Sequence, residues 1–427
     1  MTEVRPSTRR EFLAASAAAA AFHAIDVRRV PDLRRSPQDD RELKIGLVGC
    51  GGRGIGAAQN ALSTKGNVKL VAAGDAFADN LMNGLRALAH PQSGVSAKVA
   101  VAEDKRFVGF DAFQRVVDAD VDVVILATPP HFRPAHFAYA VEKGRHVFVE
   151  KPVAVDGAGV RQVLAAADVA DQKKLCVGVG LQRHHQTGYV ETMKRIHGGE
   201  IGDVVAARCY WNQGLLWHKD RRPEWSDMEW QMRNWLYFAW LSGDHIVEQH
   251  IHNLDVINWA KAAHPVRAMG MGGRQVRTDS KYGHIYDHHD VHFEFADGSF
   301  MFSQCRQIEG CANQVSEHVV GTKGRADLNT GGWTITGENA WQFPRKDQNE
   351  PYQAEHDDFF AAIRTGNVYN EARYGAESTL TAVMGRMATY SGRVVTWDEA
   401  LASDRLGPET YEWSDLPVPP VPIPGRD

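Results

Sequence analysis

The sequence has little of what several broad classes of protein require. It holds 427 residues, with 48 Lys and Arg against 53 Asp and Glu, a formal net charge of −5. Because no long basic run occurs in the body of the chain, its charge gives no support for a nucleic-acid or anionic-membrane partner. The five cysteines are an odd number without CxxC spacing. This excludes a disulfide framework and a zinc ribbon.

What is present is ordinary globular composition. Hydrophobic residues make up 43% of the chain and charged residues 24%, with 39 Gly and 18 Pro. These values exclude a disordered chain, a collagen-like fibre and a coiled coil. The length favours two domains once the unusual N-terminus is set aside.

The N-terminus has the pattern of an export signal. Residues 7–13 read STRREFL, and an Ala-rich stretch follows over residues 14–22. A charged segment before a short apolar stretch is typical of a signal peptide, and the stretch is too short for a membrane anchor. The paired Arg9 and Arg10 resemble a twin-arginine signal; the alternative is a disordered tail that happens to hold two arginines. We expect a signal peptide over 1–24, a linker over 25–42, the twin-arginine export machinery as a partner, and a periplasmic or otherwise exported protein.

A dinucleotide-binding pattern follows the linker. Residues 43–48 form a short apolar run typical of a buried parallel strand, and GCGGRG follows at once. A tight glycine turn lets the backbone approach a pyrophosphate, and the N-terminus of the next helix supplies N–H groups. A second strand, over 68–73, leads to Asp75, placed where an acid would hold a ribose 2′-hydroxyl. The pattern favours NAD, with NADP possible; the alternative is a plain glycine turn with a solvated acid. The candidate cofactor residues are Gly49, Gly51, Gly52, Arg53, Gly54 and Asp75.

Further alternation of strand and helix predicts a doubly wound parallel sheet. Strands are expected over 121–127 and 146–149, with a helix over 134–143 between them. Ligands of such sheets bind at the carboxyl ends of the strands. The residues that leave these two ends would therefore face the nicotinamide half of the cofactor: Thr128, Pro129, His131, Glu150 and Lys151.

The order and spacing of several motifs resemble a known family. After the glycine turn come ATPPH (127–131), GRHVFVEKP (144–152), IHGGEIGDV (196–204), GTKGRADL (321–328) and HDDFFAAIRTG (356–366). Together they resemble the Gfo/Idh/MocA oxidoreductases, two-domain NAD(P)-dependent enzymes of sugars and cyclitols. The resemblance implies a Rossmann domain over 43–155 and an α+β domain over 156–410 with a large, mostly antiparallel sheet. A Pro-rich tail over 411–427 and a homo-oligomer are also expected.

The same resemblance suggests catalytic residues. In the family the lysine of the EKP motif touches the reacting hydroxyl, which points to Lys151; the alternative is a lysine that holds the two domains together. A cation there would stabilise a developing alkoxide. The family's D-x-x-x-H signature corresponds to Glu248 and His252, which a helix would place on one face. His252 would be the base and Glu248 would orient it; the alternatives are an interface histidine and a surface acid.

Substrate residues are expected in the second domain. Strands are predicted over 204–211, 291–295, 300–307 and 314–321, the second and third joined as a hairpin through 296–299. Arg183 would contact substrate or form a domain salt bridge. Trp211 and Trp217 would stack on a sugar ring, or belong to a capping segment or subunit interface. Asp255, in the same motif as His252, is a further substrate candidate.

No metal is expected. His245, Glu248 and His252 would share a helical face, with Asp244 and His250 close in sequence. Histidine and carboxylate are common metal ligands. The spacing is not HExxH, however, and members of the resembling family ordinarily work without metal. The histidines at 284, 288, 289 and 292 favour a loop and strand start over a ligand set.

These patterns predict an exported NAD(P)-dependent oxidoreductase that acts on a secondary hydroxyl of a sugar, glycoside or cyclitol. Because free NAD is scarce outside the cytoplasm, the cofactor is expected to be retained between turnovers. One alternative is an NAD-dependent glycoside hydrolase or lyase that works by transient oxidation and elimination. Another is a dinucleotide-binding protein without catalysis.

Overall fold

The computed structural model describes residues 41–329 and 331–426. The expected signal peptide over 1–24, and the linker as far as residue 40, lie outside the described residues. Within the described residues, no helix combines the length and the apolar character that crossing a bilayer would need.

The first sheet confirms the predicted doubly wound arrangement. Its six strands pair in parallel in the order β3-β2-β1-β4-β5-β6. The central strands form from short apolar runs whose side chains are almost all buried, as a sheet covered on both faces requires. The strands are β1 (Leu43–Val48), β2 (Val68–Asp75), β3 (Arg106–Val108), β4 (Val123–Leu126), β5 (His146–Val149) and β6 (Val177–Val179). Their helices are α2 (Gly52–Ser63), α3 (Ala78–Ala89), α4 (Ala112–Asp118), α5 (Arg133–Glu142) and α6 (Gly157–Gln172).

The first sheet extends beyond residue 155, where the sequence placed the end of the first domain. Strand β6 pairs in parallel with β5, so Val177 lies beside Val147 and Val179 beside Val149. Residues 177–179 therefore belong to the first sheet. The hydrogen bonds between β6 and β5 place β6 in this sheet. The order of residues along the chain does not reveal this pairing.

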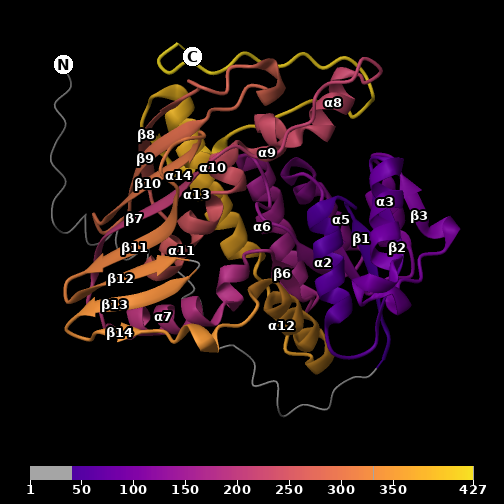
Figure 1. The fold of residues 1–427 in the computed structure, drawn as a ribbon, viewed down its shortest axis with the longest axis horizontal. Coiled ribbons are helices and arrows are strands. Elements are labelled where there is room, and N and C mark those ends of the chain that lie inside the picture. Colours follow the sequence, from indigo (N-terminus) through magenta and orange to yellow (C-terminus); the bar gives the residue numbers. More distant parts are fainter. Residues whose placement is uncertain (1–40, 330, 427) are drawn as a thin grey trace. The chain divides into compact units, whose positions relative to one another are not determined.

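The second sheet has nine strands and is mostly antiparallel, as expected. The order is β14-β13-β12-β11-β7-β10-β9-β8-β15, with one parallel pair between β7 and β10 (Figure 1). The predicted hairpin closes β9 and β10 through a Phe295 N–H donated to the Ser299 carbonyl at 2.9 Å. The strands are β7 (Val204–Gln213), β8 (Arg267–Gly273), β9 (His288–Glu294), β10 (Phe300–Gln307), β11 (Gln314–Gly321), β12 (Gly324–Asn329), β13 (Gly332–Gly337), β14 (Trp341–Gln342) and β15 (Val395–Thr396).

Helices pack on one face of this sheet and leave apolar side chains on the other. Inward-facing Val291, Phe293 and Met301 are buried in the core. On the opposite face, Met269 and Phe302 lie half exposed, and His292 stacks on Phe302 with ring centroids 5.0 Å apart. The homo-oligomer expected from the family resemblance stays a prediction.

The remaining helices connect or cover the two sheets. Two of them, α12 and α13, lie between β14 and β15 in the chain. The bounds are α7 (Thr187–His197), α8 (Asp227–Arg233), α9 (Ala239–Ser242), α10 (His245–Glu248), α11 (Ile251–Lys261), α12 (Pro351–Thr365), α13 (Ala372–Ser391) and α14 (Trp397–Ala402).

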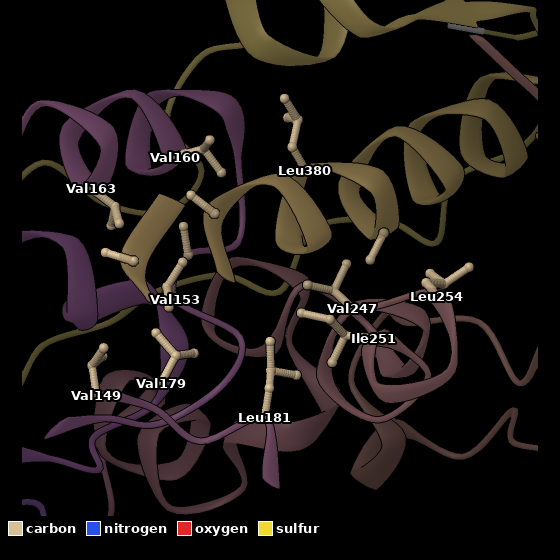
Figure 2. Close-up of a cluster of buried hydrophobic side chains, with 14 of the residues drawn as sticks. Val149, Val153, Val160, Val163, Val179, Leu181, Val247, Ile251, Leu254 and Leu380 are labelled. Atoms are coloured by element: carbon tan, nitrogen blue, oxygen red, sulfur yellow. The ribbon is translucent and has the colours of Figure 1, made fainter. Parts of the chain in front are cut away.

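One apolar core joins the elements of the two predicted domains. Figure 2 shows Val149 of β5 and Val179 of β6 gathered with Val247 of α10, Ile251 of α11 and Leu380 of α13. All five side chains are essentially inaccessible to water. Removing this much apolar surface from water fixes the first sheet against α10 and α11. The residues that directly follow Val149 and Val247 are thereby held near each other.

Stability is predicted to depend on the protonation of His185. Its ring contacts Asp358 at 2.7 Å and Glu371 at 3.2 Å. Burial alone would lower the pKa of His185, but the two carboxylates outweigh burial and raise this pKa from 6.5 to about 10. The stabilisation is therefore complete below pH 6.5 and is lost as the pH rises towards about 10. We expect His185→Gln to lower the free energy of unfolding by about 3 kcal/mol at about pH 6, where the ring is protonated.

The measurement is urea unfolding of both proteins between about pH 6 and pH 10, since the difference between them cancels the titration of other groups. The difference should shrink steadily as the pH rises. A difference that stays constant over this range contradicts the assigned ion pairs.

Candidate active site

The glycines between β1 and α2 divide their roles as a dinucleotide site requires. Gly49 has φ +93°, and a Cβ there would lie 2.7 Å from the backbone of Ala127 and Thr128. A Cβ on Gly54 would lie 1.9 Å from the Gly49 carbonyl oxygen. Gly51 and Gly52, in contrast, have no atom within 4 Å of their Cβ positions. Two of these glycines therefore pack the loop, and two leave an open approach to the backbone at the start of α2, which fits a pyrophosphate.

Asp75 ends β2 beside this loop. Its carboxylate accepts the Cys50 N–H at 2.7 Å and the Phe77 N–H at 2.9 Å. Burial raises the pKa of Asp75, and these N–H groups act in the opposite direction. The carboxylate both braces the glycine loop and lines the adjoining cavity. A carboxylate in this place fits the ribose contact that the sequence predicts.

The cavity beside the loop has a largely aromatic wall. Gly49, Gly51, Asp75, Thr128 and Pro129 all line it, which brings five of the predicted cofactor residues together. Phe77, Phe110, Phe113, Phe132 and His136 add rings from the first domain, and Met232 and Trp235 come from the second domain. We call this space the dinucleotide cavity. Its shape and chemistry fit a ligand with flat rings and a phosphate group.

His131 lies outside the lining of this cavity. Its Nε2 is 2.7 Å from the Tyr411 hydroxyl, and its ring packs edge-on against Trp240. Burial, together with the nearby Arg405, lowers the pKa of His131 to about 3. A neutral ring turned towards the C-terminal segment is a different position from the cofactor contact that the sequence predicts.

Arg53 and Glu150 contact each other. The Arg53 guanidinium lies 2.5 Å from Glu150 and 3.1 Å from Glu355 of α12, above the Tyr352 ring. Both carboxylates are almost fully buried, whereas the Arg53 side chain is about one third exposed (34%). In this structure, the two predicted cofactor residues are thus linked to α12 in an ionic network at the edge of the glycine loop.

Lys151 and Glu248 meet across the two domains. The Lys151 ammonium donates to the Glu248 carbonyl at 2.8 Å and to its carboxylate at 3.0 Å. Lys151 is the second residue after β5 and Glu248 ends α10, so the apolar core described above sets this distance. Both side chains are only slightly exposed. The carboxylate predicted to orient His252 contacts the lysine instead.

Glu248 and His252 also lie in separate helices, which corrects the expected single helical face. The N–H groups of Gln249 and His250 both point to the His245 carbonyl, and α11 begins afresh at Ile251. The side chain of His250 is buried and lies 2.7 Å from the Ser303 hydroxyl. No hydrogen bond joins Glu248 to His252 among residues 41–329 and 331–426. Packing of His250 against β10 accompanies the break.

His252 is buried and stacks on Trp211. The two rings are 5.8 Å apart and nearly parallel, at 21°. Burial, together with the positive charges of Lys151, Arg183 and Arg53, holds the pKa of His252 well below its ordinary value. The imidazole is therefore neutral and can accept a proton.

Two predicted substrate residues have their polar groups engaged within the fold. Arg183 contacts the buried Glu317 and donates to the His252 carbonyl. The geometry therefore matches the salt-bridge alternative for Arg183, between η5 (Gln182–His185) and β11. Asp255 accepts from Ser378 at 2.8 Å through one oxygen, and His184 lies 2.9 Å from the other. These contacts hold the helix that carries His252.

Trp217 is placed differently from Trp211. It lies in the loop after β7, about half exposed (47%), and packs edge-on against Trp235 of the dinucleotide cavity. It is therefore accessible to a ligand, but its ring neighbour belongs to the cavity wall and not to the pair Lys151 and His252.

Asp244, His245 and His289 form a buried cluster whose ligand atoms lie within 4.8 Å of one another. The Asp244 carboxylate accepts from the Tyr286 N–H and the Tyr390 hydroxyl and lies 3.3 Å from His289. Burial alone would raise the pKa of Asp244, but His289 and its other partners outweigh burial and lower it. The Asp244 carboxylate thus already has partners within the chain. We interpret the cluster as a buried hydrogen-bonded network and assign no metal to it.

Several site residues were missed in the sequence. Arg133 donates to the carbonyls of Thr128 and Pro152 and so ties together the chain ends that leave β4 and β5. The rings of Phe77 and Phe110 lie two residues beyond β2 and β3. A search for aromatic residues just after each parallel strand would have found Phe77. It would have missed Phe110, because the three-residue β3 was not predicted.

Two glycine substitutions should separate folding from cofactor binding. Gly54→Ala is expected to lower the free energy of unfolding by about 1–3 kcal/mol, because its Cβ collides with the Gly49 backbone. Gly51→Ala should change it by less than about 0.5 kcal/mol, because the space is open. The Cβ added in Gly51→Ala should weaken NADH binding by about tenfold or more, since it stands where the backbone faces the ligand.

Urea unfolding and NADH fluorescence titration measure the two effects. Equal stability losses in both variants, or unchanged NADH affinity in Gly51→Ala, would contradict the assigned roles.

Known proteins resemble the chain in both domains. The model of an oxidoreductase family with an NAD-binding Rossmann fold matches residues 43–181, and the GFO/IDH/MocA C-terminal domain matches residues 189–327. Inositol 2-dehydrogenase of Burkholderia lata is 28% identical over 260 residues, which cover 60% of this chain and 65% of that protein. The scyllo-inositol 2-dehydrogenase (NAD(+)) of Bacillus subtilis is 22% identical over 68% of this chain and 75% of its own length. Inositol 2-dehydrogenase 1 of Saccharopolyspora erythraea is 27% identical, and the chain spans 57% of its length.

Solved structures share the fold. An aldose-aldose oxidoreductase from Caulobacter crescentus, complexed with glycerol, is 18% identical with a TM-score of 0.66; the match covers 83% of this chain and all of that one (100%). A levoglucosan dehydrogenase in complex with NADH and levoglucosan has a TM-score of 0.64 at 18% identity, over 83% of this chain and 99% of that one. The two family models, which together match more than half of the chain, agree with the parallel sheet, the glycine loop and the second sheet. The chain therefore belongs to the Gfo/Idh/MocA family of NAD-binding oxidoreductases.

Proposed function

We propose that this protein moves a hydride between NAD and a secondary hydroxyl of a sugar, glycoside or cyclitol. The observation that carries the proposal is the contact between the Lys151 ammonium of the first domain and Glu248 of the second, with the neutral His252 close in sequence. The related inositol dehydrogenases, and a fold neighbour bound to NADH and levoglucosan, support this class of substrate.

Lys151 would bind and polarise the hydroxyl that reacts. An ammonium within hydrogen-bond distance lowers the pKa of an alcohol and stabilises the alkoxide that develops as its hydrogen leaves. Glu248 accepts from Lys151 in this structure and so fixes the position of the lysine side chain. When bound, the nicotinamide supplies the acceptor or donor of the hydride.

His252 would take the hydroxyl proton during oxidation and return it during reduction. Its lowered pKa keeps the ring neutral at ordinary pH, as a proton acceptor must be. Its Nδ1 is buried and has no hydrogen-bond partner in the described chain. Trp211 covers one face of the ring and limits its motion. The Arg183 contact to the His252 carbonyl holds the backbone at the same point.

Asp75 supports NAD over NADP. A carboxylate at the end of β2 repels a 2′-phosphate and accepts hydrogen bonds from a free ribose hydroxyl. The aromatic lining of the cavity also supports the proposal that the cofactor is retained between turnovers. A retained cofactor must return its hydride to a second carbonyl substrate or to the same molecule.

The test is the absorbance of the dialysed protein in the reduced-nicotinamide band while sugars and cyclitols are added. We expect substrate to change this band in the wild type. Lys151→Met should slow the change about 10²–10³-fold, because one preorganised donor is lost, and leave NADH affinity within about twofold. Lys65→Met, a change at an exposed lysine just after α2, serves as the matched control.

Full activity in Lys151→Met would refute the assignment of the lysine. No spectral change with any polyol would contradict the reaction. Release of phenol from an aryl glycoside without net NADH would instead indicate cleavage by transient oxidation and elimination.

We also propose that the protein is exported through the twin-arginine route. The supporting observation is the STRREFL motif before the Ala-rich stretch at 14–22. Replacing Arg9 and Arg10 together by Lys should leave most of the protein in the cytoplasm, whereas the unaltered chain is recovered outside it. Cell fractionation followed by immunoblotting measures this distribution, and equal distributions would contradict the proposal.

A further inference from the structure

Two rings form the wall of the dinucleotide cavity at one end. Phe77 follows β2 and Phe110 follows β3, so both stand at the carboxyl edge of the sheet where parallel strands bind ligands. Asp75, the residue proposed to hold the adenosine ribose, precedes Phe77 by two positions. These rings therefore mark the adenosine end of the cavity.

The C-terminal segment covers the outer side of these rings. Trp413 packs against Phe110 with ring centroids 4.5 Å apart and against Phe77 at 5.1 Å. Tyr411 packs against Phe110 at 5.6 Å and against Phe132 at 5.1 Å, and its hydroxyl meets His131. The rings of Phe77 and Phe110 thus line the cavity and also pack against the C-terminal segment. Such aromatic contacts stabilise the wall beyond the apolar area they bury.

Arg233 makes a second connection to the same rings. Its guanidinium lies 4.0 Å from the centre of the Phe77 ring and 3.0 Å from the Asp79 carboxylate in the first domain. Arg233 ends α8, and the residue before it, Met232, lines the cavity. Trp235, two residues on, also lines it. The second domain therefore supplies part of the cavity wall together with an ion pair that holds this part in place.

The tail and α8 are joined to each other. The Met228 N–H donates to the Ser414 carbonyl at 3.2 Å, and the Gln231 amide donates to the Leu416 carbonyl at 2.6 Å. The Leu416 N–H donates to Asp227 at 3.2 Å. Tail, α8 and the two phenylalanines consequently form one connected group, and none of them can move outwards without breaking contacts to the others.

We propose that Arg233, Tyr411 and Trp413 form a latch that closes the adenosine end of the cavity and so retains the dinucleotide over many turnovers. The inference rests on the proposed function, for which it identifies the residues that retain the cofactor. Lys151 and His252 lie outside the cavity lining. The latch residues are therefore separate from the proposed reacting groups. Exchange of the cofactor would require the contacts to Asp79, Phe77 and Phe110 to open.

The test uses full-length protein loaded with NADH and chased with excess NAD, with the loss of bound NADH fluorescence giving the dissociation rate. Trp413→Ala and Arg233→Met should each raise this rate by at least about tenfold, because changes at a closed interface act mainly on dissociation. Hydride transfer in a single turnover at saturating NAD should stay within about twofold of the wild type. Ile423→Ala, a change at a half-exposed tail residue beyond the latch, serves as the matched control and should leave the rate unchanged.

The outcomes separate the latch from the proposed reaction. A wild type that reacts normally but exchanges NADH within seconds overturns the latch alone, as do variants with wild-type dissociation rates. A wild type that binds no nicotinamide nucleotide overturns both proposals. If Trp413→Ala lowers the midpoint temperature of unfolding, the NADH dissociation rate of Arg233→Met decides between the outcomes. Methionine keeps the apolar stem of the arginine side chain, so this variant preserves more of the packing.

Discussion

The burial of one apolar core shared by both domains positions the site. Val149 of β5 and Val247 of α10 enter the same core. The polar residues that follow them in the sequence are Glu150 and Lys151 in the first case and Glu248 in the second. Since packed interiors resist even small displacements, the core fixes where an ammonium and a carboxylate emerge. The contact between Lys151 and Glu248 is a consequence of this packing. Ion pairing alone would not hold two flexible side chains in one place.

Around the core, charged groups are paired across elements distant in sequence. Arg183 lies against Glu317, Arg53 against Glu150 and Glu355, and Asp244 against His289. A buried charge without a partner is strongly destabilising, so each pair fixes the relative position of the elements that carry it. Near two of these pairs, burial together with the positive charges of Lys151, Arg183 and Arg53 holds the pKa of His252 well below its ordinary value.

Features set by short-range patterns could be predicted from the sequence. The glycine turn, the parallel strands and the β9–β10 hairpin each depend on residues that are neighbours along the chain. The contacts of residues whose partners are distant in the sequence could not be predicted. The break between α10 and α11 accompanies the packing of His250 against Ser303, and the partner of Glu248 lies nearly a hundred positions away. Arg183 looked equally suited to substrate and salt bridge, because only the fold brings Glu317 to it.

The contact of Arg53 with Glu355 extends the cofactor-binding half far beyond its own stretch of sequence. Helix α12, which follows the second sheet, returns to lie against α2; Gln353 also contacts Asn60 there. A fragment ending at residue 181 would expose the apolar faces that Phe359 and Phe360 cover and leave Arg53 with one carboxylate fewer. The nucleotide-binding unit is therefore discontinuous: the ribosome must release residues from the last fifth of the chain before that unit can be completed.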